Sequence, residues 1–379
     1  MMNLTIKNIA RTALTVIFAI IISAVSISAA TFTVTNTNDT GAGSLRDAIT
    51  QANAAAGADT IVFSSLFDSA QTIQLASSLP NYNSADPLTI TGPGSNLLTI
   101  RGNDTFRIFT LTTNSIVTLS GLTITKGRDT FFGGGGIYKQ FGTLSITNVV
   151  VTANSGSGGG GIQLFNGATL NAVNSTISNN TVTGEGGGIS AIQSSTINLT
   201  NTTVSGNMAG GNGGGIVASD GVSVTTGGSS ISNNSSGDRG GGVYFSGAGT
   251  FQMTDTTVSG NSSVQGGGGI HNSGTATITN CTITNNSSAD GGFAQGGGIN
   301  NIATLTVTGS TISGNTSSRL GAGIFSAANV ATTLTITNST ISNNNLNTTV
   351  SFDGGGGLLL GGNDTATITN STISGNTIT

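Results

Sequence analysis

The sequence has few of the residues that usually carry crosslinks, metals or catalysis. Its 379 residues include no Trp, one Cys, one His and three Pro, and only 6% are charged. A net charge of −4 excludes the basic surface on which nucleic acids bind. The single cysteine, Cys281, excludes an internal disulfide, and the single histidine, His271, lacks the partners that a metal site needs. We therefore expect no nucleic acid partner, no metal and no cofactor.

Helix-forming residues are also scarce, since Thr, Val, Ile, Asn and Gly dominate in place of Leu, Glu and Lys. This composition argues against a helical repeat protein. The 60 glycines, taken with the many Ser, Thr and Asn residues, would suit a flexible linker. A regular row of Ile, Val and Leu argues against that and predicts a folded, β-rich chain.

Residues 1–30 have the pattern of a secretory signal peptide. Lys7 and Arg11 supply the positive start, residues 13–22 form an apolar run, and small residues at 28–30 form a cleavage site. An uncleaved membrane anchor is the alternative, but the apolar run is too short to span a bilayer comfortably. We expect an exported protein, secreted or at the cell surface, with no membrane span in the mature chain.

The remaining chain is a repeat. Between Gly134 and Thr379 a glycine run ending in an aliphatic residue, a β-rich stretch and the motif Ile/Val-x-x-Asn recur nine times, at steps of mostly 25–29 residues. A period in this range is typical of a solenoid, in which each coil buries its apolar face against its neighbours. The asparagines that end the motifs are Asn154, Asn180, Asn207, Asn234, Asn261, Asn286, Asn315, Asn344 and Asn376.

Each repeat contains short β-strands. One is an apolar-polar-apolar triplet such as Leu305-Thr306-Val307, one is the Thr-Ile-Ser segment, and a third begins where the glycine run ends. Alternation with a period of two is typical of a half-buried strand. Three such strands per coil, repeated in one direction, predict an all-β fold: a right-handed, single-stranded parallel β-helix with three sheets. Stacked asparagines would then form a structural hydrogen-bonded ladder at a tight corner.

Residues 31–130 are less regular, and we expect them to form an N-terminal cap followed by irregular first coils. Residues 44–56 predict an amphipathic helix with Ser44 and Asp47 as a capping box and Gly57 as its stop. This helix would cover the open apolar end of the solenoid. Residues 131–379 form the nine regular coils. The chain stops just after a strand, so we expect that a further segment or another chain covers the last coil.

The N-terminal segment resembles that of CSLREA-type bacterial β-helix proteins. The resemblance lies in Thr-Val-Thr-Asn-Thr-Asn-Asp at residues 33–39, Gly-Ser-Leu-Arg-Asp-Ala-Ile at 43–49 and Ala-Asp-Thr-Ile-Val-Phe at 58–63. The Gly-Gly-x-Ile and Ile-x-x-Asn repeats resemble the Gly-Gly-Ala-Ile and Phe-x-x-Asn repeats of chlamydial polymorphic outer-membrane proteins. Gly43 stands where the first family has Cys, and Ile or Val replaces Phe in the second. The resemblance implies a pectate-lyase-like fold and a bacterial surface protein associated with adhesion or the outer membrane.

Polysaccharide lyases and glycoside hydrolases also have this fold, so a pair of acidic residues on neighbouring coils would indicate an enzyme. Hydrolysis needs two carboxylates about 5–10 Å apart around one glycosidic bond. Glu185 and Asp238 precede glycine runs two coils apart, or roughly 10 Å along the axis, and Arg239 adjoins Asp238. These three residues are the candidate catalytic group, with isolated, solvated loop charges as the alternative.

A second candidate lies on the strand after each glycine run. Tyr244, His271 and Asn300 follow the closing aliphatic residues of three consecutive coils, so we expect them to form an exposed aromatic and amide strip that contacts glycans or proteins. A passive surface column is the alternative. A threonine column suggests ice binding more weakly, because Gln and Asn residues interrupt it; its members are Thr277, Thr306, Thr335 and Thr367.

The sequence therefore favours a non-enzymatic, exported β-helix that acts as an adhesive or structural rod. Its partners would be glycans, or proteins on the surface of a host or a neighbouring cell. The alternative is a polysaccharide lyase or glycoside hydrolase, which should show long loop walls around clustered acids.

Overall fold

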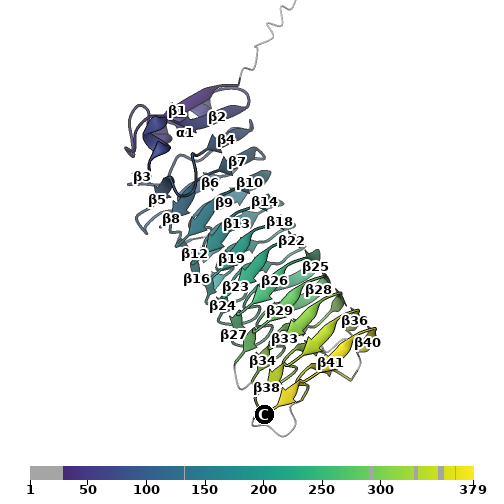
Figure 1. Ribbon diagram of the computed structural model, residues 1–379. Coiled ribbons are helices and arrows are strands. Elements are labelled where there is room, and N and C mark those ends of the chain that lie inside the picture. The colour runs from purple at the N-terminus through teal and green to yellow at the C-terminus, as the bar shows by residue number, and fades with distance from the viewer. Residues whose placement is uncertain (1–28, 132, 290–293, 328–331, 349–353, 363) are drawn as a thin grey trace, which may run out of the picture.

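The computed structural model describes residues 29–131, 133–289, 294–327, 332–348, 354–362 and 364–379. These residues form an elongated stack of parallel β-coils, with one α-helix near the N-terminal end (Figure 1). The predicted signal peptide lies almost entirely outside the described residues. None of the helices in the described part is long and apolar enough to cross a membrane.

The strands of the described residues form three sheets, which we call A, B and C, and every pairing between them is parallel. Sheet A comprises β1 (Thr31–Val34), β2 (Asp59–Phe63), β4 (Leu88–Thr91), β6 (Phe109–Leu111), β7 (Ile116–Ser120), β9 (Ile137–Gln140), β10 (Thr143–Thr147), β13 (Ile162–Phe165), β14 (Thr169–Val173), β17 (Ile189–Ala191), β18 (Thr196–Thr200), β21 (Ile216–Ala218), β22 (Ser223–Gly227), β25 (Val243–Thr254), β28 (Ile270–Thr279), β31 (Ile299–Asn301), β32 (Thr304–Thr308), β35 (Ile324–Ser326), β36 (Thr333–Thr337), β39 (Leu358–Leu360) and β40 (Thr365–Thr369). Sheet B comprises β3 (Gln71–Gln74), β5 (Leu98–Arg101), β8 (Thr123–Thr125), β11 (Val150–Thr152), β15 (Thr176–Ser178), β19 (Thr203–Ser205), β23 (Ser230–Ser232), β26 (Thr257–Ser259), β29 (Thr282–Thr284), β33 (Thr311–Ser313), β37 (Thr340–Ser342) and β41 (Thr372–Ser374). Sheet C comprises β12 (Ser155–Gly158), β16 (Thr181–Glu185), β20 (Met208–Ala209), β24 (Ser235–Ser236), β27 (Ser262–Ser263), β30 (Ser287–Ser288), β34 (Thr316–Ser317), β38 (Asn345–Leu346) and β42 (Thr377–Ile378).

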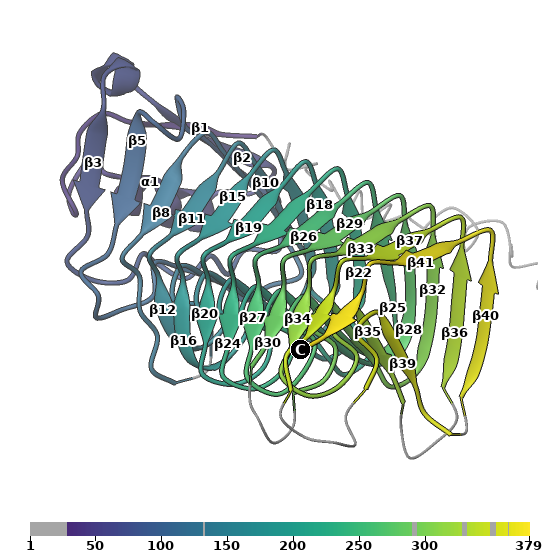
Figure 2. The same cartoon turned by 60° about the horizontal axis from the view of Figure 1, so that its bottom comes forward.

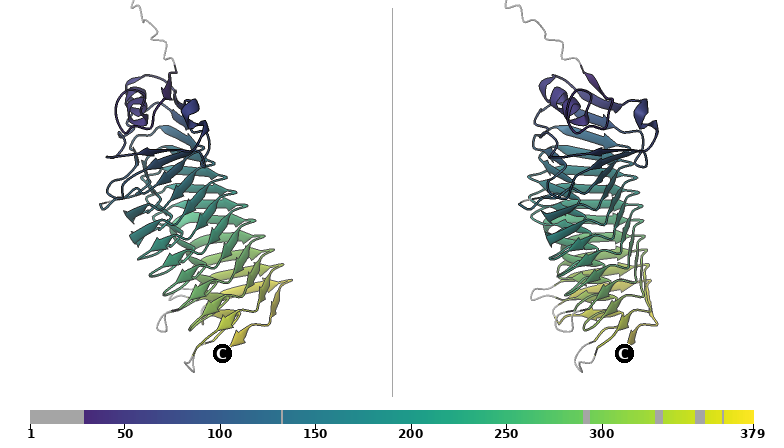
Figure 3. Two further views of the ribbon diagram at one scale, coloured as in Figure 1. Left: turned by 60° about the vertical axis from the view of Figure 1, so that its left-hand side comes forward. Right: turned by 90° about the vertical axis from the view of Figure 1, so that its left-hand side faces the viewer.

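Like side chains stack directly above each other, as the repeat predicts. In sheet B, Ile283 pairs with Ile312 and Ile312 with Ile341, and all three side chains are fully buried. The two hydroxyl-bearing residues that flank each of these isoleucines face the other way. The predicted parallel β-helix is therefore confirmed, and Figure 3 shows its coils stacked along one axis. The buried apolar side chains of successive coils form one core.

The assignment of strands to sheets differs from the prediction. The strand that begins at the end of the glycine run and the Leu-x-Ile strand belong to one sheet, and in β25 and β28 a single strand runs through both positions. The third sheet, C, follows the ladder asparagine instead. Most of its strands are only two residues long and rich in Ser, so they carry no alternating apolar pattern that a sequence could reveal.

Two left-handed corners flank sheet B in every regular coil. The residue before each ladder asparagine has φ between 53° and 63°, and only Asn, Gly and one Ala occur there. A similar corner precedes the sheet B strand, with φ between 48° and 60° at Asn, Gly or Asp. Asn, Asp and Gly enter this region most easily, which explains why the repeat is rich in them.

The ladder asparagines occupy one buried column. In the middle of the column, Asn261 donates from its backbone N–H and from Nδ2 to Oδ1 of Asn286, both at 2.9 Å, and from Nδ2 to the carbonyl of Ile231 at 2.9 Å. Its own Oδ1 accepts two hydrogen bonds from Asn234. The same pattern links every successive pair from Asn154 to Asn376.

The predicted capping helix is present as α1 (Leu45–Ala54), which is followed by a short 3-10 helix, η1 (Ser65–Asp68). The Ser44 side chain accepts a hydrogen bond from the Asp47 N–H at 3.1 Å. The helix ends at Ala54, before the predicted stop at Gly57, because Ala55 already adopts an extended backbone. The predicted apolar stripe is buried in the same core as the coils and consists of Leu45, Ala48, Ile49 and Ala52.

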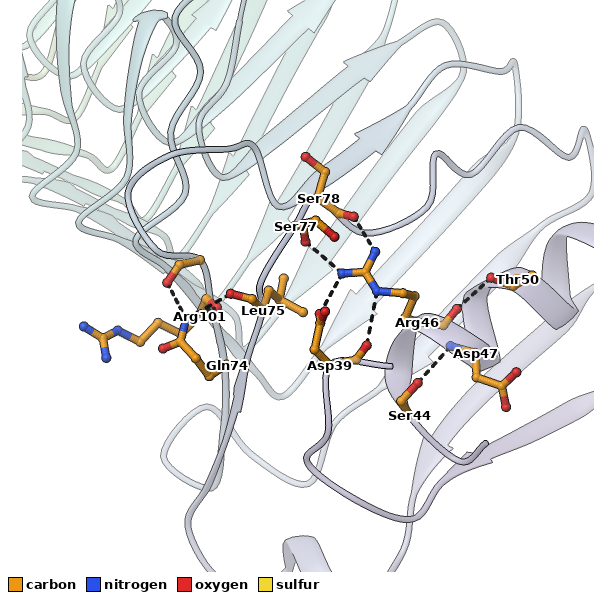
Figure 4. Close-up of polar contacts among 11 residues, drawn as sticks. Asp39, Ser44, Arg46, Asp47, Thr50, Gln74, Leu75, Ser77, Ser78 and Arg101 are labelled. Carbon is orange, nitrogen blue, oxygen red and sulfur yellow. Dashed lines mark hydrogen bonds and ion pairs between the residues drawn. The ribbon is translucent and has the colours of Figure 1, made fainter. Parts of the chain in front are cut away.

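Arg46 fixes this helix to the neighbouring loops (Figure 4). Its Nη2 lies 2.6 Å from Oδ1 of Asp39 and donates to the carbonyl of Ser77 at 2.8 Å, while Nη1 donates to the carbonyl of Ser78. Nε donates to the Asp39 carbonyl at 3.1 Å, so all three guanidinium nitrogens have an oxygen partner. These contacts join the helix to the turn before it and to the loop between β3 and β4.

The last coil is the exposed end of the core. Ile368, Ile373 and Ile378 are 41%, 47% and 57% exposed, whereas the residues that pair with them one coil earlier are buried. The expectation that a further segment or another chain covers this coil stays a prediction.

The charged side chain of Lys139 lies inside the solenoid. Lys139 of β9 is fully buried, and its Nζ donates to the carbonyls of Ser115 at 2.9 Å and Thr113 at 3.1 Å. Burial lowers the pKa of this amine to about 8. The carbonyl groups partly replace the water that the ammonium loses.

The ladder predicts a large cost for removing one asparagine. Asn261→Ala removes the acceptor for two Asn234 donors and the donor for the Ile231 carbonyl, all of them buried. We expect the free energy of unfolding to fall by about 3 kcal/mol. The exposed Asn83→Ala should change it by less than about 0.5 kcal/mol. Urea denaturation measures both, and equal effects would contradict the ladder's structural role.

Lys139 predicts a stability that rises with pH. Between pH 8 and about 10.4 the unfolded chain holds a proton that the folded lysine has released, so raising the pH favours folding. We expect the stability of the wild type relative to Lys139→Met to rise by about 1 kcal/mol per pH unit in this window. Denaturant melts at several pH values measure this difference, and a constant difference would contradict the burial of a titrating amine.

Candidate functional site

The first regular coils carry a groove on their outer surface. The groove encloses about 570 Å³ beside β9, β13 and β17 of sheet A. We call it the N-terminal groove. Its lining residues are Phe131, Tyr138, Ser157, Gly158, Gln163, Phe165, Gly184, Glu185, Ser190 and Ile192.

The wall of the groove comes from sheet C. Strands β12 and β16 have four and five residues, whereas the next strands of sheet C have two, and the two longer strands lie side by side (Figure 2). We call this pair of strands the ridge. The ridge is closely packed, since a Cβ on Gly184 would lie 2.2 Å from the carbonyl oxygen of Ser157. The two strands also shift register between Gly156 and Gly158. Glycine at these positions therefore lets the longer strands stand side by side.

Tyr138 is held in place from one side. The Arg107 guanidinium lies over its ring, 4.6 Å from the ring centroid, and Arg107 Nε donates to the Gly134 carbonyl at 3.0 Å. Asp129 forms an ion pair with the same guanidinium, and both side chains are mostly buried. Burial raises the pKa of the Tyr138 hydroxyl, and the nearby Arg107 partly opposes that shift. The ring is thus a preformed aromatic surface at the groove.

Polar groups lie beside this ring. Gln163 pairs with Tyr138 on one side and Ser190 on the other, and its Nε2 donates to the Leu164 carbonyl at 3.2 Å. Glu185 is exposed at the end of β16, where its Oε1 accepts a hydrogen bond from Asn212 at 2.6 Å. The groove therefore combines apolar ring faces with amide, hydroxyl and carboxylate groups.

The candidate catalytic residues do not meet in this groove. Glu185 lines it, but Asp238 and Arg239 are not among its lining residues. Asp238 lies 4.0 Å from the Arg239 guanidinium, and Asn212 stands between the two acids, since its Oδ1 accepts from the Arg239 N–H at 3.2 Å. The three predicted residues form a polar row along the solenoid, with one carboxylate in the groove.

The prediction that Tyr244, His271 and Asn300 form an exposed strip is wrong, because two of the three side chains are buried. Tyr244 and His271 stack with ring centroids 5.0 Å apart, but His271 is only 2% exposed and Asn300 only 1%. The glycine runs pass close to this column, and a Cβ on Gly266 would lie 2.5 Å from Nδ2 of Asn300. Nothing in the sequence marks this close approach, because those segments are short and rich in glycine. A role for these three residues in binding stays untested.

Residues that the sequence did not single out make up most of the groove. Tyr138 and Gln163 lie in the same column as Tyr244, three to four coils nearer the N-terminus. The sequence predicted no role for Phe131, Phe165 or Arg107. No signal in the sequence marks these longer strands, because the segments from Asn154 to Ile162 and from Asn180 to Ile189 are no longer than the one from Asn207 to Ile216.

His271 predicts acid sensitivity. Burial, and secondarily Arg239, lower the pKa of its imidazole to about 3. Below about pH 6.5 the unfolded chain binds a proton that the folded imidazole cannot, so stability falls by up to about 1.4 kcal/mol per pH unit between pH 6 and 3. We expect His271→Phe to reduce this slope relative to the wild type. Denaturation of both proteins at pH 4, 5 and 7 measures this pH dependence. The same loss of stability in the wild type and in His271→Phe would contradict the role of the buried imidazole.

Comparisons with known proteins bear on the fold. The chain matches the family model described as "Right handed beta helix region" over residues 187–378, just over half its length. No curated protein matches the chain. A solved structure titled "Crystal structure of Agl-KA catalytic domain" is 17% identical, with a TM-score of 0.52, and the match covers 87% of this chain and 61% of that one. This chain thus spans less than two thirds of that structure, and the similarity shows a shared fold alone.

A second solved structure is more distant. Titled as a mannuronic acid specific polysaccharide family 6 lyase from human gut microbiota, it is 10% identical, with a TM-score of 0.37 and coverage of 89% of this chain and 91% of that one. A score this low carries no argument about this chain. The match to the family model and the parallel coils of sheets A, B and C show that the chain belongs to the right-handed β-helix family.

Proposed function

We propose that this protein binds glycan chains in the N-terminal groove and acts as an exported, non-enzymatic β-helix rod in adhesion. The observation that carries the proposal is the aromatic surface of Tyr138, which Arg107 holds in place at the edge of a 570 Å³ groove. The volume lies within the range of pockets that bind small ligands. Such a groove accommodates a few sugar units of a longer chain.

The chemistry of the groove suits a sugar. A pyranose ring presents apolar C–H groups on its faces and hydroxyl groups around its edge. The rings of Tyr138, Phe165 and the exposed Phe131 offer apolar surface for the faces, while Gln163 and Glu185 offer polar atoms for the edge. An aromatic ring that is already fixed loses little conformational entropy when a ligand stacks on it.

Export and surface location are part of this proposal. The signal-like residues 1–30, and the resemblance to CSLREA-type and polymorphic outer-membrane proteins, support them. The partners would be glycans or glycoproteins on the surface of a host or a neighbouring cell. The stacked coils and the continuous asparagine ladder suit a stiff support that holds the groove at one end.

Cleavage of a polysaccharide in the same groove is the second candidate function. It is favoured by the position of Glu185, an exposed carboxylate that lines the groove beside Tyr138. Hydrolysis would need a second carboxylate about 5–10 Å away. Among the residues that line the groove in the described part, Glu185 is the only one with a carboxylate. This is why we place binding ahead of cleavage.

Glycan-array screening of the purified protein tests the proposal. We expect Tyr138→Ala to weaken binding at least about tenfold, because a stacked aromatic side chain contributes more than 1 kcal/mol. The matched control is Tyr244→Ala, in the same column four coils away and outside the groove. Binding that survives Tyr138→Ala but is lost in Tyr244→Ala would contradict the choice of groove.

A lyase and hydrolase screen on the glycans that bind separates the two functions. No product is expected for a binding protein. Product formation that Glu185→Gln abolishes, while Asp238→Asn leaves it unchanged, would establish the second candidate instead.

A further inference from the structure

The charge of the N-terminal groove indicates which glycans it accepts. Of the lining residues that the structure describes, Glu185 is the only one that carries a full charge at neutral pH, and none is Lys, Arg or His. The base Arg107 does not line the groove but lies over the ring of Tyr138, which does. The groove therefore presents negative charge to a ligand.

Arg107 is not available to balance an acidic sugar. Asp129 forms an ion pair with its guanidinium, Gly134 accepts a hydrogen bond from its Nε, and the Tyr138 ring covers its face. The side chains of Arg107 and Asp129 are 18% and 11% exposed, so little of either charge reaches solvent. The pair is close to neutral when seen from the groove.

An acidic glycan would thus bring a carboxylate or sulfate towards Glu185, and the described residues that line the groove include no cation to pair with it. Like charges in a partly dehydrated groove repel each other, and an anion that loses water without gaining a partner is disfavoured. A neutral glycan avoids both costs. Its hydroxyl groups can donate to Glu185, and hydrogen bonds to a charged acceptor are stronger than neutral ones.

The other polar groups of the groove also suit hydroxyls. Gln163 carries an amide, and Ser157 and Ser190 carry hydroxyl groups, so each can both donate and accept. We propose that the N-terminal groove selects neutral, hydroxyl-rich glycans and discriminates against uronate-containing and sulfated ones, with Glu185 as the residue that sets this specificity. The inference rests on the proposed glycan-binding function.

The other side of the ridge differs in charge. A second cavity of about 380 Å³ shares Ser157 with the groove and is lined by Arg128, Asp129 and several Ser and Thr residues. Arg128 is exposed. Binding of acidic glycans in this second cavity would not depend on Tyr138. Tyr138→Ala therefore distinguishes binding in the groove from binding in the second cavity.

The test is isothermal titration with matched neutral and acidic probes: gluco- and manno-oligosaccharides of six sugars against oligogalacturonate and oligomannuronate of the same length. We expect at least about tenfold tighter binding of a neutral probe, lost in Tyr138→Ala. The binding should change little between about 0.05 and 0.5 M NaCl, because it involves no ion pair.

Two substitutions test the role of Glu185 itself. Glu185→Lys should bring uronate affinity to within about threefold of the neutral affinity or above it, whereas Glu185→Gln should narrow the difference without reversing it. The same changes at Asp238, outside the groove, are the matched controls and should leave the ratio unchanged. Circular dichroism confirms that the variants fold.

The outcomes separate this inference from the proposed function. If uronates bind more tightly than neutral probes and Tyr138→Ala abolishes that binding, the inferred selectivity for neutral glycans is wrong, but glycan binding in the groove is supported. If acidic glycans bind more tightly than neutral ones and that binding depends on Arg128 and not on Tyr138, the second cavity is the binding site. That result also contradicts the inferred selectivity of the groove. If neither kind of probe binds in a Tyr138-dependent way, the proposed function itself fails.

Discussion

From Asn180 onward, the carboxamide of each ladder asparagine accepts two hydrogen bonds from the asparagine of the preceding coil and donates one to a carbonyl there, as Asn261 does. A left-handed residue stands immediately before each asparagine, so the amide can turn into the coil only at that point. This constraint sets the register of sheets B and C at their shared corner. Because the register is fixed, isoleucines stack on isoleucines and each coil completes the core of the next.

The N-terminal groove depends on a local exception to that regularity. In most coils the segment after the ladder asparagine pairs for two residues, but β12 and β16 extend further and form a ridge. The ladder continues undisturbed beneath them, through Asn154 and Asn180. The fold can therefore vary its outer loops without altering its core. The ridge, the column of Tyr138 and the Arg107–Asp129 pair together make a recognition surface on an otherwise plain rod.

Much of the fold followed from the sequence, because the features that specify it recur every 25–29 residues. The buried rows, the ladder asparagines and the stripe of α1 all lie where periodicity places them. The two-residue strands of sheet C were missed because Ser-Ser carries no alternation. The groove was missed for a different reason: Arg107 and Tyr138 are 31 residues apart, and they meet only because successive windings bring them together. His271 and Asn300 were misplaced because glycine-rich segments pass close to them.

The glycines at the ends of the glycine runs have a consequence for how such a chain can change. A Cβ on Gly269 would lie 2.6 Å from the carbonyl oxygen of Gly298 and 3.1 Å from the amide of Asn286, and Gly242 is equally confined. Replacement of this glycine by any other residue is therefore disfavoured in every winding. Gain or loss of one complete winding meets no such obstacle, because its two neighbours present equivalent surfaces. Descendants of such a chain can thus differ in length by whole windings while the groove at the N-terminal end keeps its shape.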